Sequence, residues 1–314
     1  MQVALNQNIY IAGVGAIGSL LACRLTQENS AINLILKNET QLTTYQQSGL
    51  TINYENHNYS CHPKANTIDN LGETPINYLI ACVKAYDILN LLIDLKANLN
   101  EHSIIILLNN GLGVLDEIKI KFSHLRIISG ICTMGAYLEK PFTVKAFLNG
   151  KFHLGSINDA FTHNELEFFY KSFKKANLPI QWEEDIKTII WEKFALNCSI
   201  NILTVIFSCK NGELLDHGDL LKDLTAEIAA VIRAYGINIE ASTLLKKVIS
   251  LLKNVGENYS SMYCDVKSNK TTEISHLNEY LIKLAEEKNM PTKLNSKLLK
   301  QFYMAYDNNN KYPT

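Results

Sequence analysis

Residues 8–25 read N-I-Y-I-A-G-V-G-A-I-G-S-L-L-A-C-R-L, a short apolar run that passes through three glycines directly into a helical pattern. The spacing G-x-G-x-x-G between strand and helix is typical of a turn that binds a dinucleotide. The first glycine permits a tight turn, the second lets a pyrophosphate approach the backbone, and the third lets helix and strand pack. A glycine-rich turn that binds nothing is the alternative. We expect cofactor contacts from Gly13, Val14, Gly15, Ala16, Ile17 and Gly18.

The end of the next strand bears on the choice of cofactor. Residues 32–36 (I-N-L-I-L) form a second apolar run, and Lys37 and Asn38 follow it. Proteins that bind NAD usually carry an Asp or Glu here, which bonds the 2′-hydroxyl of the adenosine ribose. A lysine would instead attract the 2′-phosphate of NADP. The sequence therefore favours NADPH, although the nearby Glu39 leaves NADH open.

Three further segments fall where a parallel sheet meets its ligand. Lys84 ends a buried strand, at the edge where such sheets bind ligands, unless it is an ordinary surface lysine. The loop 109–113 (N-N-G-L-G) also follows a strand, and we expect its Asn110 to contact cofactor or substrate, with a plain turn as the alternative. Met134-Gly-Ala136 is expected to form another turn near the same crevice.

The polar residues of segment 191–213 (W-E-K-F-A-L-N-C-S-I-N-I-L-T-V-I-F-S-C-K-N-G-E) do not fall where a solvated helix would have them. At about 100° per residue, they form one narrow stripe while apolar residues cover the remaining surface. The stripe consists of Lys193, Asn197, Asn201 and Thr204. Asn is a weak helix former and is unusual on a solvated face. We expect the stripe to line a cleft, where a cation and two amides could hold a carboxylate and a carbonyl; a buried structural amide network is the alternative.

The order of elements predicts two domains. Strands and helices alternate up to about residue 184, and beyond residue 185 the pattern is helical almost to the end. We therefore expect an α/β protein, with an N-terminal Rossmann-type dinucleotide-binding domain (1–184) and an all-helical C-terminal domain (185–314) that carries the substrate site. Two short strands, at 50–53 and 59–62, should form a hairpin. Later strands should complete the main sheet, at 126–132, 143–148 and 152–154.

Composition limits the partners and the compartment. The 314 residues include 30 basic and 31 acidic side chains, and this balance predicts neither a nucleic acid nor an anionic membrane as partner. Residues 1–6 lack the start of a leader peptide, and no run reaches the ~18 apolar residues of a membrane span. The seven cysteines are scattered without a C-x-x-C pair, and no metal-ligand cluster stands out. We expect a cytoplasmic protein without a metal.

Taken together, the glycine turn, the Asn-Gly loop and a helical domain entered through W-E-K-x-x-x-N-x-x-x-N resemble the ketopantoate reductase (2-dehydropantoate 2-reductase) family. The resemblance covers essentially the whole chain, and its most specific segments are W-E-K-F-A-L-N-C-S-I-N-I-L-T, C-K-N-G-E-L, E-N-Y-S-S-M and T-E-I. It implies that NADPH reduces ketopantoate to pantoate in the pantothenate route, with Lys193 as general acid. It implies substrate binding by Asn110, Asn197, Asn201, Asn211 and Ser261. The family's cofactor-contacting positions correspond, besides the glycine turn, to Lys37, Lys84, Asn110, Ala136 and Glu273.

The implied chemistry suits these residue types. Reduction of a 2-keto acid needs a hydride at C2 and a proton for the developing alkoxide. A protonated Lys193 would stabilise that oxygen and supply the proton. The amide stripe and Ser261 can orient the carboxylate and the distal hydroxyl of the substrate. Because the cofactor turn and Lys193 lie on different predicted domains, we expect closure on substrate binding.

Two positions depart from the family pattern. Ile202 stands where the family often has Pro, which puts a bend of the helix in doubt. Lys37 stands where Arg is familiar, so a phosphate would meet a point charge rather than a bidentate fork. Two other functions stay open. One is an NAD(P)-dependent dehydrogenase for another 2-keto or 3-hydroxy acid, because the fold alone does not fix the substrate. The other is a sensor that binds NADP without turnover and would need no proton donor. The sequence is compatible with a monomer or a homodimer.

Overall fold

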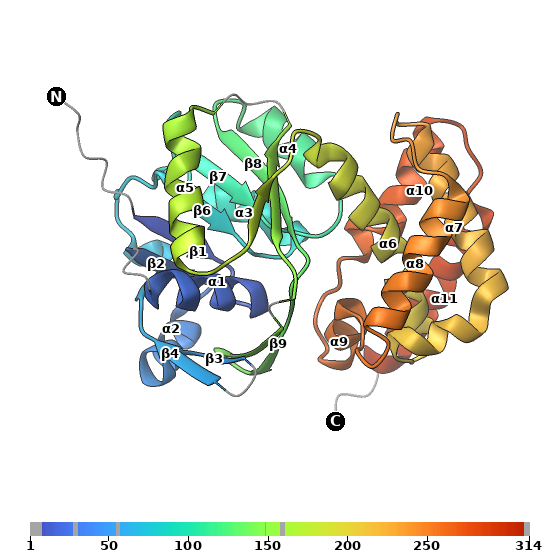
Figure 1. Ribbon diagram of the computed structural model, residues 1–314, viewed down its shortest axis with the longest axis horizontal. Helices are drawn as coiled ribbons and strands as arrows, with labels where there is room; N and C mark the ends of the chain where they lie inside the picture. Colours follow the sequence, from blue (N-terminus) through green and yellow to red (C-terminus); the bar gives the residue numbers. More distant parts are fainter. Residues whose placement is uncertain (1–7, 28–30, 55–56, 148, 158–160, 311–314) are drawn as a thin grey trace. The chain divides into compact units, whose positions relative to one another are not determined.

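The computed structural model describes residues 8–27, 31–54, 57–147, 149–157 and 161–310, with side chains up to residue 306. The residues considered for a leader peptide lie outside these ranges. The chain divides into two compact units. Unit 1 runs through Asn109 and includes Leu115–Ile186, whereas unit 2 comprises Asn110–Val114 and the chain from Lys187 onward. Unit 1 is α/β and unit 2 is helical apart from the loop 110–114 (Figure 1), so the predicted fold class is confirmed.

The main sheet of unit 1 has, within the described residues, the strand order β12-β11-β8-β7-β6-β1-β2-β5. Its strands are β1 (Ile9–Ala12), β2 (Ile32–Leu36), β5 (Lys64–Thr67), β6 (Tyr78–Ala81), β7 (Ile104–Leu107), β8 (Arg126–Cys132), β11 (Phe152–Ser156) and β12 (Ile180–Trp182). Neighbouring strands are parallel, except that β11 runs antiparallel to β8. The strand order reverses beside β1, between β2 and β6. A ligand of such a sheet binds at the carboxyl ends of the strands at this reversal.

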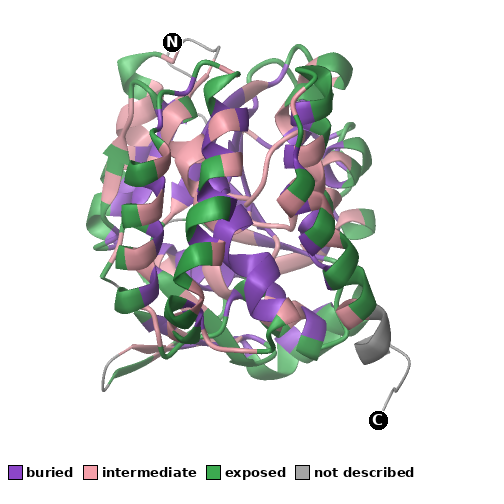
Figure 2. Cartoon of the chain, turned by 90° about the vertical axis from the view of Figure 1, so that its right-hand side faces the viewer, coloured by how far each residue is buried: buried purple, intermediate pink, exposed green. Residues whose placement is uncertain are grey.

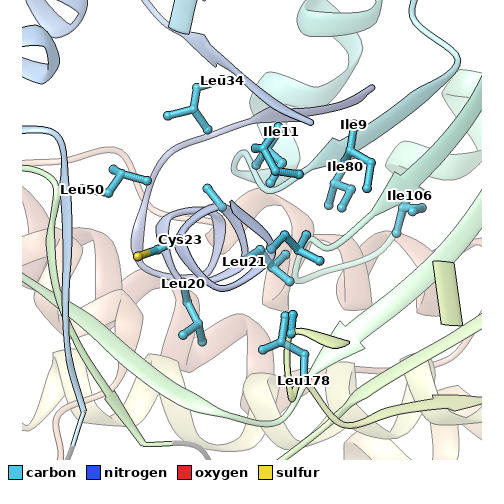
Figure 3. Packing of buried hydrophobic residues seen from close by; sticks show 14 of the residues in the cluster. Ile9, Ile11, Leu20, Leu21, Cys23, Leu34, Leu50, Ile80, Ile106 and Leu178 are labelled. Carbon is cyan, nitrogen blue, oxygen red and sulfur yellow. The ribbon is translucent and has the colours of Figure 1, made fainter. Parts of the chain in front are cut away.

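The helix that follows the glycine turn is the centre of the unit 1 core. The helical elements of this unit are α1 (Ala16–Gln27), α2 (Glu39–Ser48), η1 (Ile68–Asn70), α3 (Ala85–Asp94), α4 (Val114–Lys121) and α5 (His163–Lys175). Figure 3 shows Leu21 of α1 on the side of the helix that faces Ile11 of β1 and Ile80 of β6, whereas Leu20 points away from these strands; both leucines belong to the core. Because β1, β6 and β7 are buried along their whole lengths, they read as continuous apolar runs in the sequence.

A second, smaller sheet in unit 1 corrects part of the expected topology. Its order is β4-β3-β10-β9, with β3 (Leu50–Tyr54), β4 (His57–Cys61), β9 (Gly135–Lys140) and β10 (Thr143–Phe147). The β3–β4 hairpin is confirmed. The segment expected to extend the main sheet instead pairs, as β10, parallel to β3 and antiparallel to β9; Leu148 lies outside the described residues. Val144 and Ala146 are buried on the side of this sheet that packs on α1.

Unit 2 is built from helices around its own core. Its elements are α6 (Ile186–Ile206), η2 (Asn211–His217), α7 (Gly218–Arg233), α8 (Ala241–Asn254), α9 (Ser261–Lys267), η3 (Ile274–His276), α10 (Asn278–Glu287) and α11 (Lys293–Asn310). In Figure 2 the helices facing the viewer alternate between buried and exposed residues along their length. This banding is what the apolar periodicity of the sequence predicts.

The first helix of unit 2, α6, is long and has a high mean hydropathy. By length and composition, α6 is apolar enough to cross a membrane, although polar residues interrupt its apolar run. In the structure 56% of that stretch is buried. Phe194, Cys198 and Ile202 of α6 belong to the unit 2 core. The apolar composition of α6 is thus accounted for by packing inside a folded unit.

Candidate active site

The glycine turn between β1 and α1 has the geometry that its spacing predicts. Gly13 has a φ of +87°, and a Cβ there would lie 2.5 Å from the carbonyl carbon of Cys82. A Cβ on Gly18 would lie 2.1 Å from the carbonyl oxygen of Gly13, so only glycine allows helix and turn to pack this closely. A Cβ on Gly15, in contrast, would meet nothing within 4 Å. The turn is open where a phosphate would approach the start of α1, and it fits a dinucleotide.

An open pocket of about 660 Å³ lies beyond the end of β2. It is lined by Lys37, Asn38, Glu39, Thr40, Thr67, Ile68, Asp69 and Asp94. The Glu39 carboxylate is engaged by its neighbours, because its Oε1 accepts hydrogen bonds of 2.9 Å from Thr67 Oγ1 and Asn70 Nδ2. Lys37 is exposed. The pocket thus presents the Lys37 ammonium beside a carboxylate that other side chains already hold.

Two other expected cofactor positions lie on different elements of unit 1. Lys84 is half-buried and is the N-cap residue of α3, just after the carboxyl end of β6. Ala136 does not lie in a turn: it is part of β9 and stands opposite Ala146 of β10. The expected turn at Met134–Ala136 is thus reduced to a bend at Met134, because ladder bonds to a neighbouring strand extend Gly135 and Ala136. Contact of Ala136 with a cofactor stays a prediction.

The Asn-Gly loop packs with unit 2. Asn110 is half-buried, and Leu112 packs against the helical core. The N–H of Leu112 donates to the carbonyl oxygen of His276 at 3.0 Å. Glu273, expected to flank a helix, is the N-cap residue of η3 and only 5% exposed. Asn110 and Glu273 are therefore presented by segments of one unit that are hydrogen-bonded to each other.

The polar stripe of α6 has two parts with different surroundings. Lys193 and Asn197 are half-buried, whereas Asn201 is 7% exposed and Thr204 is fully buried. The Thr204 hydroxyl lies 2.7 Å from the carbonyl oxygen of Asn201, to which it donates, and 2.6 Å from Ser260 Oγ. Thr204 therefore has the structural role that was the alternative for the stripe. The helix also runs uninterrupted through Ile202.

Ser261 is positioned by the contact that Thr204 makes. Ser260 Oγ accepts from the N–H of Tyr263 at 3.0 Å and so caps α9, whose first residue is the exposed Ser261. The Thr204–Ser260 bond thereby joins the start of α9 to α6. No sequence pattern separates this buried threonine from the ligand-facing part of the stripe, because both have the same helical spacing.

Asn211 offers a hydrogen-bond acceptor that the described residues leave unused. Its N–H donates to Asn258 O at 2.9 Å, and its Nδ2 donates to Val255 O at 3.3 Å. The side chain is 6% exposed, and its Oδ1 is buried with no hydrogen-bond partner within the described part of the chain. A buried polar atom without a partner is costly, so this oxygen is suited to a donor on a ligand.

Two ionisable groups near these residues have defined states. Burial raises the pKa of the Cys198 thiol well above its ordinary value, so Cys198 stays a neutral core residue between Asn197 and Asn201. A hydrogen bond to Glu257, at 2.8 Å, raises the pKa of Lys210. Lys210 is thus a paired surface cation, distinct from Lys193 on α6.

The expected site residues form two groups. Unit 1 carries the glycine turn, Lys37, Lys84 and Ala136. Unit 2 carries the remaining set, which is Asn110, Lys193, Asn197, Asn201, Asn211, Ser261 and Glu273. Within unit 2, α6 is also tied to α10 by Asn278, whose Nδ2 donates to Cys198 O at 3.0 Å. Sequence reasoning missed Asn278 and His276, since a single Asn or His in a helical segment carries no pattern of its own.

Comparisons with known proteins cover both units. Residues 9–159 match the family model "Ketopantoate reductase PanE/ApbA", and residues 185–304 match "Ketopantoate reductase PanE/ApbA C terminal". A 2-dehydropantoate 2-reductase of Vibrio cholerae serotype O1 is 29% identical over 302 residues, covering 94% of this chain and 96% of that protein. One of Yersinia pestis is 26% identical over 290 residues, 92% of each chain.

A solved structure shares the whole architecture. The structure of D-mandelate dehydrogenase with NADH and anilino(oxo)acetate superposes with a TM-score of 0.88 over 96% of this chain and 99% of that chain, at 22% identity. At that identity the likeness concerns the fold. The family models match most of the sequence, in the order and positions of the two units. The chain belongs to the ketopantoate reductase family.

Proposed function

We propose that the protein reduces 2-dehydropantoate (ketopantoate) to pantoate with NADPH, a step of pantothenate and coenzyme A biosynthesis. Family membership and the nearly full-length similarity to the Vibrio cholerae 2-dehydropantoate 2-reductase support this reaction. The observation that carries the substrate assignment is the buried Asn211 Oδ1, an acceptor without a donor among the described residues. Ketopantoate has a hydroxyl group on C4 that can donate to it, which many other 2-keto acids lack.

Each expected residue has a role that its chemistry permits. The bound nicotinamide supplies the hydride for C2. Lys193 holds a proton at Nζ, stabilises negative charge on the C2 oxygen and gives that oxygen its proton. Asn197 and Asn201, one and two helical turns further along α6, orient the carboxylate, as Ser261 does from the start of α9. Asn211 Oδ1 accepts from the C4 hydroxyl.

The pocket beyond β2 supports the proposed preference for NADPH. A ribose 2′-hydroxyl is usually bound by a carboxylate at the end of this strand, and Oε1 of Glu39, the acidic residue closest to it in sequence, already accepts from Thr67 and Asn70. A 2′-phosphate needs a cation, and Lys37 lines the same pocket. Because Glu39 already accepts these two hydrogen bonds, it is less available to bind the ribose hydroxyl of NADH. Residues 1–184 then act as the cofactor domain and 185–314 as the substrate domain, with Asn110 serving both.

Removal of one hydroxyl group from the substrate tests the role of Asn211. The comparison pairs ketopantoate with 3,3-dimethyl-2-oxobutanoate, which has the same carbon skeleton without the C4 hydroxyl. A site that hydrogen-bonds a substrate hydroxyl discriminates strongly against the analogue, and we expect kcat/KM for ketopantoate to be higher by at least about a hundredfold. Asn211→Ala should reduce that ratio, chiefly by lowering kcat/KM for ketopantoate. Equal use of both keto acids by the wild type would refute the substrate assignment.

The same assay separates the two rival functions. Turnover of a 2-keto acid with another substituent, in preference to ketopantoate, would indicate a related dehydrogenase. Tight NADPH binding without oxidation by any keto acid would indicate a sensor, although a sensor leaves Lys193 without a purpose. The seven cysteines are unpaired, which fits a reducing compartment, and we place the protein in the cytoplasm as a monomer or homodimer.

A further inference from the structure

One histidine binds both polar backbone groups of a residue in the Asn-Gly loop. The N–H of Leu112 donates to the carbonyl oxygen of His276 at 3.0 Å, and the carbonyl oxygen of Leu112 lies 3.1 Å from His276 Nδ1. A carbonyl oxygen only accepts hydrogen bonds, so Nδ1 carries the proton and donates. The main chain and the side chain of His276 together form a two-point clamp on Leu112.

The glycines on either side of Leu112 make this clamp possible. Gly111 has a φ of +83°, and a Cβ there would lie 2.5 Å from the His276 carbonyl oxygen. Gly113 has a φ of +93°, and a Cβ there would lie 2.6 Å from the ring of Tyr280. The backbone of the loop therefore lies directly against η3 and α10, at a distance that no other residue type would permit.

We propose that His276 is a positioning residue that fixes the position of Asn110 relative to Glu273. The inference rests on the proposed function, in which both residues serve the site. Asn110 directly precedes the clamped segment, and Glu273 directly precedes η3. The N–H of His276 donates to the carbonyl oxygen of Glu273 at 3.0 Å. The short helix η3 thus lies between Glu273 and the loop that carries Asn110. The His276 imidazole adds the second hydrogen bond that holds this loop.

The clamp also accounts for where the loop belongs. β7 before the loop and most of α4 after it are parts of unit 1. Residues 110–114 between them belong to unit 2 by their contacts. His276 acts as a fixed support for the loop.

Two substitutions separate the hydrogen bond from the bulk of the side chain. Asn carries an N–H group the same number of bonds from Cα as Nδ1, whereas Leu has similar size and no donor. We expect His276→Leu to lower kcat/KM for ketopantoate by about three- to tenfold, as the loss of one hydrogen bond predicts. His276→Asn should stay close to the wild type. Equal loss in both variants would overturn the role of the bond.

A double-mutant cycle with Asn110→Ala tests whether His276 acts through Asn110. If it does, His276→Leu costs little further activity once Asn110 is replaced, because the residue it positions is gone. Additive losses would show that His276 stabilises the fold without positioning Asn110, and would contradict the proposal.

Hydrogen exchange of segment 109–114 in the cofactor-free protein keeps the test independent of turnover. Exchange should be faster in His276→Leu than in His276→Asn or the wild type. If none of the keto acids supports oxidation of NADPH by the wild type, the proposed function fails. The double-mutant cycle is then measured through the affinity for NADPH. Unchanged exchange in His276→Leu would refute the clamp itself, whatever the activity.

Discussion

Lys193 differs from the other lysine of α6 in its surroundings. Lys193 is half-buried on the polar stripe, whereas Lys187 near the start of the same helix is exposed. If Lys193 is the general acid, Lys193→Ala should lower kcat by about 10²- to 10⁴-fold with a smaller effect on KM. Steady-state kinetics with NADPH and ketopantoate measure this effect. Lys187→Ala is the matched control and should leave kcat unchanged. A decrease in kcat of similar size in both variants would contradict the role of Lys193 as general acid.

The role proposed for Lys37 is to set the preference between the two cofactors. Lys37→Ala removes the cation that lines the pocket beyond β2, and we expect KM for NADPH to rise by about tenfold while KM for NADH changes little. Lys37→Arg should lower KM for NADPH, because the guanidinium can bind a phosphate in a bidentate manner. The control is Lys96→Ala, another exposed lysine of unit 1. A parallel rise in KM for both cofactors in Lys37→Ala would show that Lys37 does not read the 2′-position.

Residue types in the site were predictable where chemistry and spacing coincide. The glycine turn, Lys193 and the two Asn residues of α6 stand out because their types are unusual at those positions. Thr204 stands on the same stripe, yet it bonds Ser260. Whether a polar side chain on a buried face meets a ligand or another part of the chain depends on contacts between segments far apart in sequence. Periodicity within one helix carries no information about those contacts.

The loop between β7 and α4 is an element that should be sensitive to a single added methyl group. Gly111 and Gly236 have nearly the same backbone angle, with φ of +83° and +82°, but a Cβ meets the His276 carbonyl only at Gly111. Gly236→Ala should therefore carry only the backbone cost, about 1–2 kcal/mol. Gly111→Ala should cost a further 1–3 kcal/mol or so from steric overlap. Urea denaturation of both variants measures the difference, and equal loss of stability would mean that the loop moves aside without cost.

The pair formed by β8 and α5 gives unit 1 a pH-dependent contribution to stability. Arg126 donates hydrogen bonds from its two terminal nitrogens, Nη1 and Nη2, to the Glu165 carboxylate. This hydrogen bonding is the main cause that lowers the pKa of Glu165 to about 2. Because the folded-state pKa lies below the ordinary value of 4.5, the pair stabilises the fold above that value and loses its effect as the pH falls toward 2.

The variant Glu165→Gln tests this contribution. At pH 7 it should lower the free energy of unfolding by about 1–2 kcal/mol, and the difference from the wild type should shrink as the pH drops below 4.5. Glu167→Gln, which loses an exposed pair with Lys171 on the same helix, serves as the control and should change little at any pH. A difference for Glu165→Gln that is constant between pH 7 and pH 3 would contradict the pKa.

Strands were harder to assign than helices. The segment containing β10 alternates buried and partly buried residues as any half-buried strand does, and that alternation cannot tell which sheet it joins. Its partner β3 lies about ninety residues earlier, and such a pairing depends on how α1 packs beneath both strands. The small residues of β9 resembled a turn for the same reason, because a local pattern contains no sign of a distant partner.

At the scale of the molecule, the division into two units was largely predictable from the sequence. The change from alternating strands and helices to helices alone marks the boundary between the α/β unit and the helical unit. The exception is residues 110–114, which the contacts assign to unit 2 although unit 1 segments flank them. This exception carries Asn110, the residue expected to touch both cofactor and substrate. Two glycines and one histidine, rather than any extended pattern, determine its place.

The most direct test of the account is the oxidation of NADPH by the purified protein in the presence of ketopantoate, followed at the nicotinamide absorbance band. We predict rapid oxidation with one pantoate formed for each NADPH consumed, slower oxidation of NADH, and loss of turnover in Lys193→Ala. NADPH that binds tightly but is not oxidised by ketopantoate would contradict the central claim, whatever the fold and the family.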